Sequence, residues 1–352
     1  MVWPEDPGSL LTGPRGRRMC WSLVESVGRP ARPPIGPAWE QVQLSSRGAD
    51  SAELAAELGT AVAWADLDAV AAMSDVALLA AVADSVDTAM YWQPPDAVDQ
   101  ALAHADVAAA LRPVAQAVTG APGARWWSGG VELDAQRYVQ PVGESGKGLV
   151  LSETAGRLAA WLAAEAEDER SAALRPSDPA APYSGHWWSS PKWSGVASTT
   201  RALPDLGAVQ LAAMEDSPGQ DEMRCWPVKP RRVPRIYEIA EPDHWIALAA
   251  RYPLDVSKSR RHDWWKITGW PGRWLMPDYA AAAVDYDAIH LTVGGYLTTA
   301  GEALPVNDAR CLLAAWDPDE TYWLTDILAP AGPPARWVRD GSTQVDWRLA
   351  PF

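Results

Sequence analysis

The sequence predicts an α+β fold, in which a layer of helices precedes a domain built on a mixed or antiparallel β-sheet with few helices. Between residues 50 and 118, Ala-rich segments place apolar residues at three- and four-residue steps, the spacing of amphipathic helices. Beyond residue 183, short β-branched or aromatic segments bounded by Pro, Gly or Asp predict strands. These strands do not alternate regularly with helices, as they would in a βαβ fold, and this favours the α+β class.

The composition divides the chain into three parts. Residues 1–48 contain seven prolines among scattered glycines. We predict a loose arm there, because proline lacks the backbone N–H that a helix interior or a central strand needs. Residues 50–118 form the predicted helical layer. Residues 120–352 form the predicted α+β domain, which we expect to carry any catalytic or binding site.

Local signals mark the predicted elements. Asp50 followed by Glu53 resembles a capping box, and Ser74 is expected to cap the helix that follows it. We expect further helices at 96–103, at 105–118 with a break or kink at Pro113, and at 152–174, 242–250 and 277–284. The expected strands lie at 136–140, 186–188, 195–199, 208–211, 235–239, 288–293 and 322–324.

Charge and composition exclude several classes of function. The chain has 45 acidic and 30 basic residues, so its net charge of −15 disfavours non-specific binding to nucleic acid or to an anionic membrane. We find no signal peptide and no apolar run long enough to span a membrane, and we expect a cytoplasmic protein. The three cysteines and five histidines have no metal-ligand spacing, so we expect no metal.

The most unusual stretch, residues 258–274, alternates cations with indoles in an otherwise acidic protein. Residues 224–275 carry eleven Lys and Arg against five Asp and Glu. Cations beside flat aromatic faces suit a phosphate-bearing ligand with a base to stack, such as a dinucleotide or a single strand of nucleic acid, and Trp264 and Trp265 are the candidate platforms. Alternatively, these cations pair with the surplus carboxylates of the same protein.

A second pattern is a predicted strand that ends in Ser198, Thr199 and Thr200, followed by a strand with Tyr237 and, later, by Glu320 just before another strand. This arrangement resembles the arginine-serine-glutamate class of mono-ADP-ribosyltransferases, which cleave NAD between nicotinamide and ribose. The resemblance implies that Ser198, Thr199 and Thr200 brace the nicotinamide pocket and that Glu320 is the catalytic carboxylate. NAD would then be the substrate, and the acceptor stays open.

The resemblance also implies an early-strand arginine that grips the phosphates of the dinucleotide. Arg137 is the first candidate and Arg125 the second, with Tyr237 as a further cofactor contact. The chain departs from the family at Pro318, where the family has Glu or Gln two residues before the catalytic glutamate. This departure bears on transfer to an arginine acceptor more than on NAD cleavage, so an ADP-ribosyltransferase and an NAD glycohydrolase both stay open.

Two other hypotheses come from different classes. The 21 tryptophans are compatible with a non-catalytic binding module for nucleic acid, sugar or peptide. An enzyme of another type would take its acid and base from Asp263, Glu238 or His290. The residue bias also resembles uncharacterised actinobacterial proteins, which implies no activity. The discriminating question is whether Ser198 and Glu320 meet in the fold, or whether the indoles of 264–274 form an exposed platform.

Overall fold

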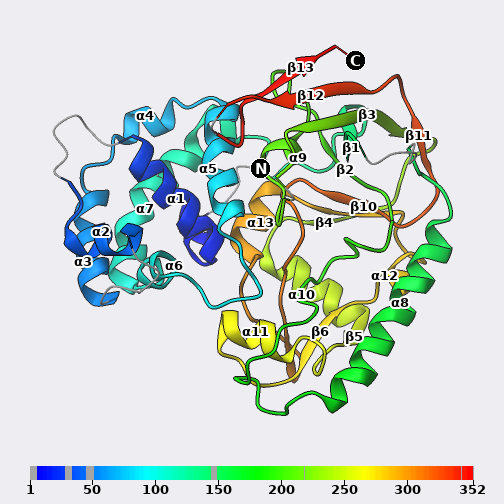
Figure 1. Ribbon diagram of the computed structural model, residues 1–352. Coiled ribbons are helices and arrows are strands. Elements are labelled where there is room, and N and C mark those ends of the chain that lie inside the picture. Colours follow the sequence, from blue (N-terminus) through cyan, green and yellow to red (C-terminus); the bar gives the residue numbers. More distant parts are fainter. Residues whose placement is uncertain are drawn as a thin grey trace.

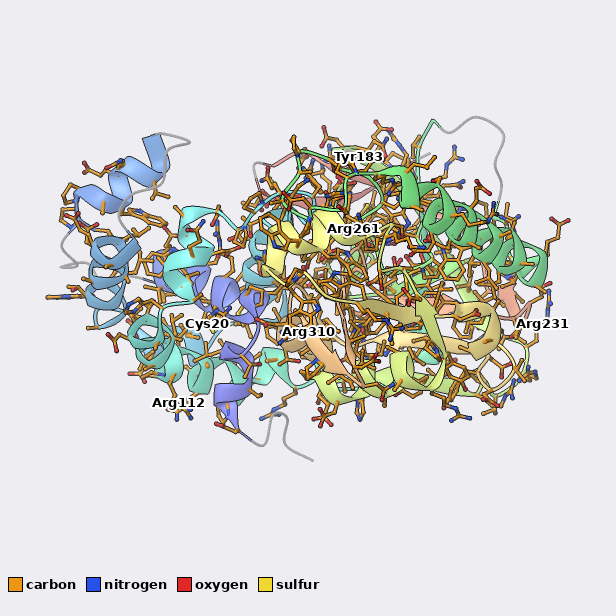
Figure 2. All side chains as sticks on the ribbon, turned by 90° about the horizontal axis from the view of Figure 1, so that it is seen from below. Cys20, Arg112, Tyr183, Arg231, Arg261 and Arg310 are labelled. Atoms are coloured by element: carbon orange, nitrogen blue, oxygen red, sulfur yellow. The ribbon has the colours of Figure 1, made fainter. Side chains whose placement is uncertain are left out.

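The computed structural model confirms the α+β class, with helices gathered on one side of a part that contains two sheets (Figure 1). Helices α1 to α7, blue to cyan in Figure 1, form the helical layer. Figure 2 shows Cys20 within this layer, Arg310 near its junction with the rest, and Arg231 at the far end. The structure describes residues 6–27, 34–44, 51–143, 149–217, 219–341 and 343–351.

The prediction of a loose arm over residues 1–48 is wrong where the structure describes them. Helix α1 (Pro14–Ser26) packs against α5 (Asp75–Asp87), and its Met19 and Trp21 are buried. Each of the three helices described in this segment, the 3₁₀ helix η1 (Pro7–Leu11), α1 and α2, begins with a proline, a position where the missing N–H costs nothing. The proline count therefore marked helix starts. The remaining helices of the layer are α2 (Pro37–Leu44), α3 (Ser51–Val62), α4 (Leu67–Ala71), α6 (Ala97–Leu102) and α7 (Ala105–Gly120).

The local helix signals have mixed outcomes. Ser74 caps α5 by accepting a hydrogen bond from the backbone N–H of Ala77, as predicted. Asp50 lies outside the described residues. Pro113 does not break α7, which runs through it with Leu111 and Val114 fully buried on one face. Burial of that face offsets the hydrogen bond that proline removes.

The larger sheet places the predicted site strands next to one another. Its order is β13-β12-β3-β1-β2-β10-β7-β4, and its pairs are antiparallel except for β4 with β7. The strands are β1 (Gln136–Pro141), β2 (Ser198–Arg201), β3 (Glu222–Pro230), β4 (Ile236–Ile239), β7 (Ala288–Leu291), β10 (Thr321–Trp323), β11 (Leu328–Pro330), β12 (Ala335–Arg339) and β13 (Trp347–Ala350).

The two faces of this sheet have different surroundings. Side chains alternate along each strand, so Ser198 and Thr200 point to one face while Thr199 and Arg201 point to the other. The first face, which we call the core face, packs on the main hydrophobic core with Ile289 and Tyr322. The second, which we call the outer face, carries a smaller apolar cluster that includes Trp323.

A smaller sheet and several helices complete the α+β part. The sheet has the order β5-β6-β9-β8, with β5 (Pro253–Asp255), β6 (Trp274–Pro277), β8 (Leu304–Val306) and β9 (Ala309–Cys311). Around the two sheets lie α8 (Thr154–Ser171), α9 (Val209–Ala212), α10 (Pro242–Arg251), α11 (Arg261–Thr268), α12 (Tyr279–Ala282) and α13 (Val293–Thr299). Among the described residues, no helix combines the length and apolar character that crossing a bilayer requires.

Three predicted strands differ from the structure. Residues 208–211 lie mostly in the helix α9, and residues 186–188 pair with no strand. The carbonyls of Trp187 and Trp188 instead accept hydrogen bonds from the side chains of Trp264 and Arg260. The segment 195–199 is extended only from Ser198, because Gly195 has a φ of 76° and belongs to a turn.

Candidate active site

The structure brings Ser198, Thr200 and Glu320 together. Strand β10 pairs with β2 so that Thr321 lies opposite Thr199 and Tyr322 opposite Ser198, which places Glu320 at the end of β10 beside Thr200. All three side chains belong to the core face of the sheet. Thr200 lies under α9, because its Oγ1 accepts the backbone N–H of Gln210 at 3.3 Å.

Glu320 is 1% exposed and its carboxyl group is held by three neighbours. Gln210 Nε2 donates to one oxygen at 3.3 Å, the backbone N–H of Asp317 donates to the other at 3.1 Å, and the Ser198 hydroxyl bonds to it as well. Burial and the charge of Asp317 raise the pKa of Glu320 to about 8, against the opposing effects of Lys192 and the Ser198 hydrogen bond. Its carboxyl group is therefore mostly protonated at pH 7.

Glu320 belongs to a buried group that we call the carboxylate cluster: Lys192, Glu215, Asp317 and Glu320. Lys192 Nζ donates to the backbone carbonyl of Glu215 at 2.6 Å and lies 3.4 Å from Asp317 Oδ1. Asp317 also accepts the Glu215 N–H at 2.8 Å and Gln210 Nε2 at 2.8 Å. One ammonium group thus serves three carboxyl groups, so two of these groups must keep a proton if the cluster is to be neutral.

The pKa shifts in the cluster agree with this charge balance. Burial raises the pKa of Glu215 to about 7, although the ammonium of Lys192 opposes the shift. Burial disfavours the charged form of Lys192, but the charges of Asp317, Glu320 and Glu215 outweigh it and raise the pKa of Lys192. Groups that exchange protons near neutral pH in a buried site are candidates for acid–base or electrostatic catalysis.

Ser198 connects this buried cluster to the surface. It is only partly buried, whereas Thr199 and Thr200 on either side of the strand are fully buried. The loop before it carries Trp193, whose side chain is 67% exposed and follows Lys192 directly in the chain. Ser198 is thus a partly exposed neighbour of the buried Glu320, and Trp193 is an exposed indole on the loop that precedes it.

Residues 314–320, which contain Asp317, Asp319 and Glu320, have a strained backbone. Ala315 and Asp319 adopt positive φ values of 57° and 60°, a conformation that costs residues other than glycine energy. The Nε1 of Trp316 donates to the backbone carbonyl of Glu320 at 3.1 Å and fixes the end of the turn. This turn sends Asp317 and Glu320 to the core face and Asp319 to the outer face.

On the outer face, a second group of charges lies across three strands and this turn. We call it the histidine cluster: Arg201, Glu238, His290 and Asp319. His290 is 1% exposed, with Nδ1 2.5 Å from Glu238 Oε2 and Nε2 3.5 Å from Asp319 Oδ1. Burial alone would lower the pKa of His290, but the hydrogen bonds to Asp319 and Glu238 raise it to about 9. The imidazole is therefore protonated at neutral pH.

The histidine cluster opens toward solvent at Glu238, whose side chain is 33% exposed. The backbone N–H of Val131 donates to its other oxygen at 3.1 Å. Gly130 lies so close that a Cβ built there would be 2.8 Å from Glu238 Oε1. Arg201 completes the group: its backbone N–H donates to Asp319 at 2.7 Å, and its guanidinium lies 5.1 Å from the ring centre of Trp126.

The predicted cofactor contacts do not converge on Glu320. Arg137 lies on β1 opposite Thr200, but its guanidinium donates to the backbone carbonyl of Gln136 at 3.0 Å. Arg125 is exposed in the segment after the helical layer. Tyr237 lies on β4, with β10 and β7 between it and β2, and its hydroxyl donates to the carbonyl of His244 at 2.7 Å.

The prediction that Trp264 stacks on a ligand is wrong. Its ring is fully buried, and its Nε1 donates to the carbonyl of Trp187 at 2.7 Å. Trp265 is half-buried, and Trp274, also in the basic stretch, is fully buried. The indoles of residues 264–274 therefore do not form the exposed platform that the binding-module hypothesis requires.

Three of the five cations of the same stretch, Arg260, Lys266 and Arg273, pair with carboxylates of the protein. Arg260 is fully buried and lies 2.6 Å from Glu165. The other cation–carboxylate pairs in and around this stretch are Lys266 with Asp263, Arg273 with Asp255 and Asp308, Arg251 with Asp285, and Arg232 and Arg235 with Asp287. Much of the positive charge seen in the sequence is thus balanced by distant acidic residues.

Sequence reasoning missed Lys192, Gln210, Glu215 and Asp317. Lys192 and Gln210 have ordinary surroundings in the sequence, and they meet Glu320 only through contacts more than 100 residues apart. Asp317 had a local signal, since it lies in the same short run as Glu320. A lysine between a Ser-rich segment and the Ser-Thr-Thr strand could also have been noted, but nothing in the sequence marks it as buried.

The described residues contain no group of three or more His, Cys, Asp or Glu side chains arranged to hold a metal ion. Comparisons with protein-family models, with curated proteins and with solved structures found no match for this chain. The function must therefore be argued from the two clusters themselves.

Proposed function

We propose that the protein cleaves the bond between nicotinamide and ribose in NAD, with Glu320 as the catalytic carboxylate. The observation that supports this most is the contact between the Glu320 carboxyl group and the Ser198 hydroxyl, which come from the neighbouring strands β10 and β2. Lys192 lies within the same cluster, where its ammonium group offsets part of the negative charge around Glu320. The resemblance to the arginine-serine-glutamate class supplies the reaction.

Cleavage of the nicotinamide–ribose bond requires a carboxylate beside the positive charge that develops on the ribose. As the C1′–N bond breaks, nicotinamide leaves with the bonding electron pair as a neutral molecule, and positive charge builds on the ribose. Glu320 in its ionised form would stabilise that charge and accept a hydrogen bond from a ribose hydroxyl. A water or an acceptor nucleophile then forms the new bond to C1′ and releases a proton to solvent.

The environment of Glu320 makes this reaction depend on pH. A carboxyl group with a pKa of about 8 is protonated at pH 7 and cannot stabilise a cation until the proton leaves. The rate of nicotinamide release should therefore rise with pH through about 8. Access is through the side of the cluster where Ser198 is partly exposed, and Trp193 offers a face on which a base can stack.

The test is to incubate the purified protein with NAD, with and without a mixture of candidate acceptors, and to measure free nicotinamide by chromatography. We expect release by the wild type and loss of about 100-fold or more in Glu320→Gln. Glu222→Gln, on β3 and partly exposed, is the matched control and should keep wild-type activity. Absence of release from folded wild-type protein under all these conditions would overturn the proposal.

A second candidate function is proton transfer at the histidine cluster, and one observation favours it. Glu238 is the carboxylate that solvent reaches directly, and it touches a protonated imidazole that is fixed from behind by Asp319. In such a pair the carboxylate can accept a proton from a substrate, and the imidazolium can stabilise the negative charge that then develops on the substrate. Glu238→Gln would then abolish activity toward a substrate class that the structure does not identify.

A further inference from the structure

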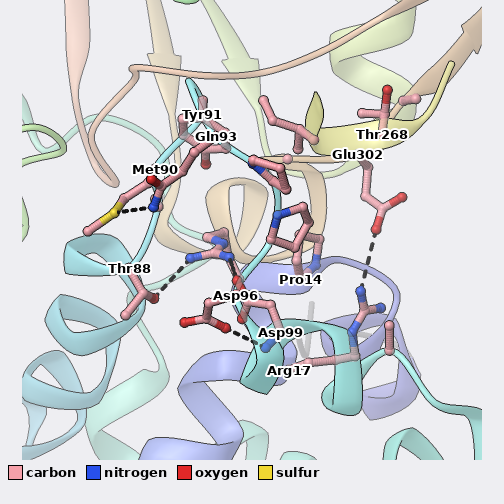
Figure 3. A pocket seen from close by; sticks show the side chains of 18 of the residues that line it. Pro14, Arg17, Thr88, Met90, Tyr91, Gln93, Asp96, Asp99, Thr268 and Glu302 are labelled. Carbon is pink, nitrogen blue, oxygen red and sulfur yellow. Dashed lines mark hydrogen bonds and ion pairs between the residues drawn. The ribbon is translucent and has the colours of Figure 1, made fainter. Parts of the chain in front are cut away.

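A cavity of about 310 Å³ with several charged side chains in its lining lies between the helical layer and the α+β part (Figure 3). One wall comes from α1, from α6 and from the segment 88–96. The opposite wall comes from the end of α11, the segment 301–303 after α13, and Arg310 on β9. The volume is at the lower end of the range for small-molecule sites, so a ligand here would be small.

Six charged side chains line this cavity, and most of them are already paired. Arg15 and Asp99 are both buried and lie 2.5 Å apart. Asp96 and Asp99 are also within 3.1 Å of Arg18, a cation just outside the cavity. Figure 3 shows the pair of Arg17 and Glu302 across the cavity, at 3.7 Å. After these pairs are formed, one lining cation is left over.

That cation is Arg310. Its Nη1 donates to the backbone carbonyl of Ala303 at 3.1 Å, and its guanidinium lies 4.2 Å from the ring centre of Trp270. Within the described parts of the chain, no carboxylate lies within ion-pair distance of it. The carbonyl and the indole fix the guanidinium plane but leave its charge unbalanced, so the cavity carries a positioned cation in an acidic protein.

The rest of the lining is mainly apolar. Ala89, Met90, Pro94, Ala103 and Ile267 are among its apolar members, and Gln93 and Thr268 add polar groups that can hydrogen-bond. A second orphaned group supports a ligand: Arg15 is 4% exposed, and its Nε has no hydrogen-bond partner. Buried donors of this kind are normally satisfied in folded proteins.

We propose that this cavity binds a small organic anion, with one anionic group against Arg310 and an apolar remainder against the proline- and alanine-lined wall. Arg310 presents a planar fork that matches a carboxylate or a phosphate. With Arg18 counted, four cations and three carboxylates surround the cavity, and the one positive charge that is left fits a ligand with a single anionic group. This proposal does not depend on NAD cleavage, although Tyr91, which lines the cavity, donates its hydroxyl to Glu215 of the carboxylate cluster at 3.0 Å.

Isothermal titration calorimetry without NAD tests the proposal, using phenyl phosphate, benzoate and the neutral benzyl alcohol as probes. We expect phenyl phosphate or benzoate to bind the wild type and benzyl alcohol to bind at least tenfold more weakly. The comparison of the two anions shows whether a phosphate or a carboxylate is preferred. Failure of both anions to bind at millimolar concentration would overturn the proposal.

Variants locate the site. Arg310→Gln should weaken anion binding about tenfold or more, and Arg310→Lys should retain part of it because the charge stays. Arg273→Gln is the matched control, since Arg273 is exposed and already paired with Asp255 and Asp308. Equal anion binding by wild type and by a folded Arg310→Gln variant, as judged by its melting curve, would show that the anion does not bind here.

Discussion

The two faces of the larger sheet carry similar sets of charged residues in opposite environments. On the core face, the carboxylate cluster is almost entirely buried, and its glutamate has a pKa of about 8. On the outer face, Glu238 is one-third exposed. There the group with the raised pKa is the imidazole of His290, at about 9. Burial therefore places the proton on the acid in one cluster, whereas ion pairing places it on the base in the other.

The comparison shows that the surroundings of a glutamate decide whether its carboxyl group holds a proton at neutral pH and whether solvent reaches it. Glu320 is buried and must lose a proton before it can stabilise a cation. Glu238 is reached by solvent without any such step. The turn that holds Asp317, Asp319 and Glu320 contributes residues to both clusters, and their side chains point to opposite faces of the sheet.

The largest expected effect comes from removing the ammonium of the carboxylate cluster. Lys192→Met leaves three buried carboxyl groups without a cation, and we expect the free energy of unfolding to fall by about 3–5 kcal/mol. Urea unfolding monitored by circular dichroism measures this. Lys229→Met, at an exposed lysine on β3, is the control and should change the free energy by less than about 0.5 kcal/mol. A change of that small size in Lys192→Met would mean that Lys192 does not balance the cluster.

The dependence of stability on pH separates the two clusters. Glu215 and Glu320 keep their protons in the folded protein up to about pH 7 and 8, whereas the unfolded chain releases them near 4.5. The free energy of unfolding should therefore fall as pH rises from about 4.5 to 8. His290 adds stability that is complete below about 6.5 and is lost as pH rises through about 9.

Glu320→Gln sharpens this assignment. It should reduce the decline between pH 4.5 and 8 without removing it, because Glu215 still contributes up to about pH 7, and it should leave the decline between 6.5 and 9, which belongs to His290 on the other face. Urea unfolding at a series of pH values checks both windows. An unchanged slope between pH 4.5 and 6.5 in Glu320→Gln would show that burial does not hold a proton on this carboxyl group.

A smaller effect is expected from Gly130→Ala, which acts on the histidine cluster alone. The new Cβ would lie 2.8 Å from Glu238 Oε1, so the flexible end of that side chain must move away from His290. Because the hydrogen bond to Glu238 supports the raised pKa of His290, we expect this pKa to fall, as measured by NMR titration of the imidazole. Gly156→Ala in α8, where a Cβ meets no atom within 4 Å, should leave it unchanged.

The sequence predicted the parts of the fold that rest on local patterns. Strand 136–140, the helix after Ser74 and the helix after Pro242 have clear periodicity or caps, and the structure has all three. The proline-rich start was misjudged because proline at the first turn of a helix and proline in a loop look alike in composition.

The candidate site was only partly predictable. Ser198 and Glu320 came from the resemblance, and their side chains meet in the structure. Lys192 and Glu215 could not be found, because they join the cluster through contacts between distant parts of the chain. The burial of Trp264 was not predictable for the same reason. Its neighbour Arg260 pairs with Glu165, about a hundred residues away in the sequence, and both Arg260 and Trp264 are fully buried.

The most direct test of the account is the rate of nicotinamide release from NAD at pH 8.5, measured side by side for the wild type, Glu320→Gln and Glu238→Gln. The account predicts that Glu320→Gln loses about 100-fold or more, while Glu238→Gln stays within a few-fold of the wild type. Loss of release in Glu238→Gln with full activity in Glu320→Gln would contradict the account and move the reaction to the outer face.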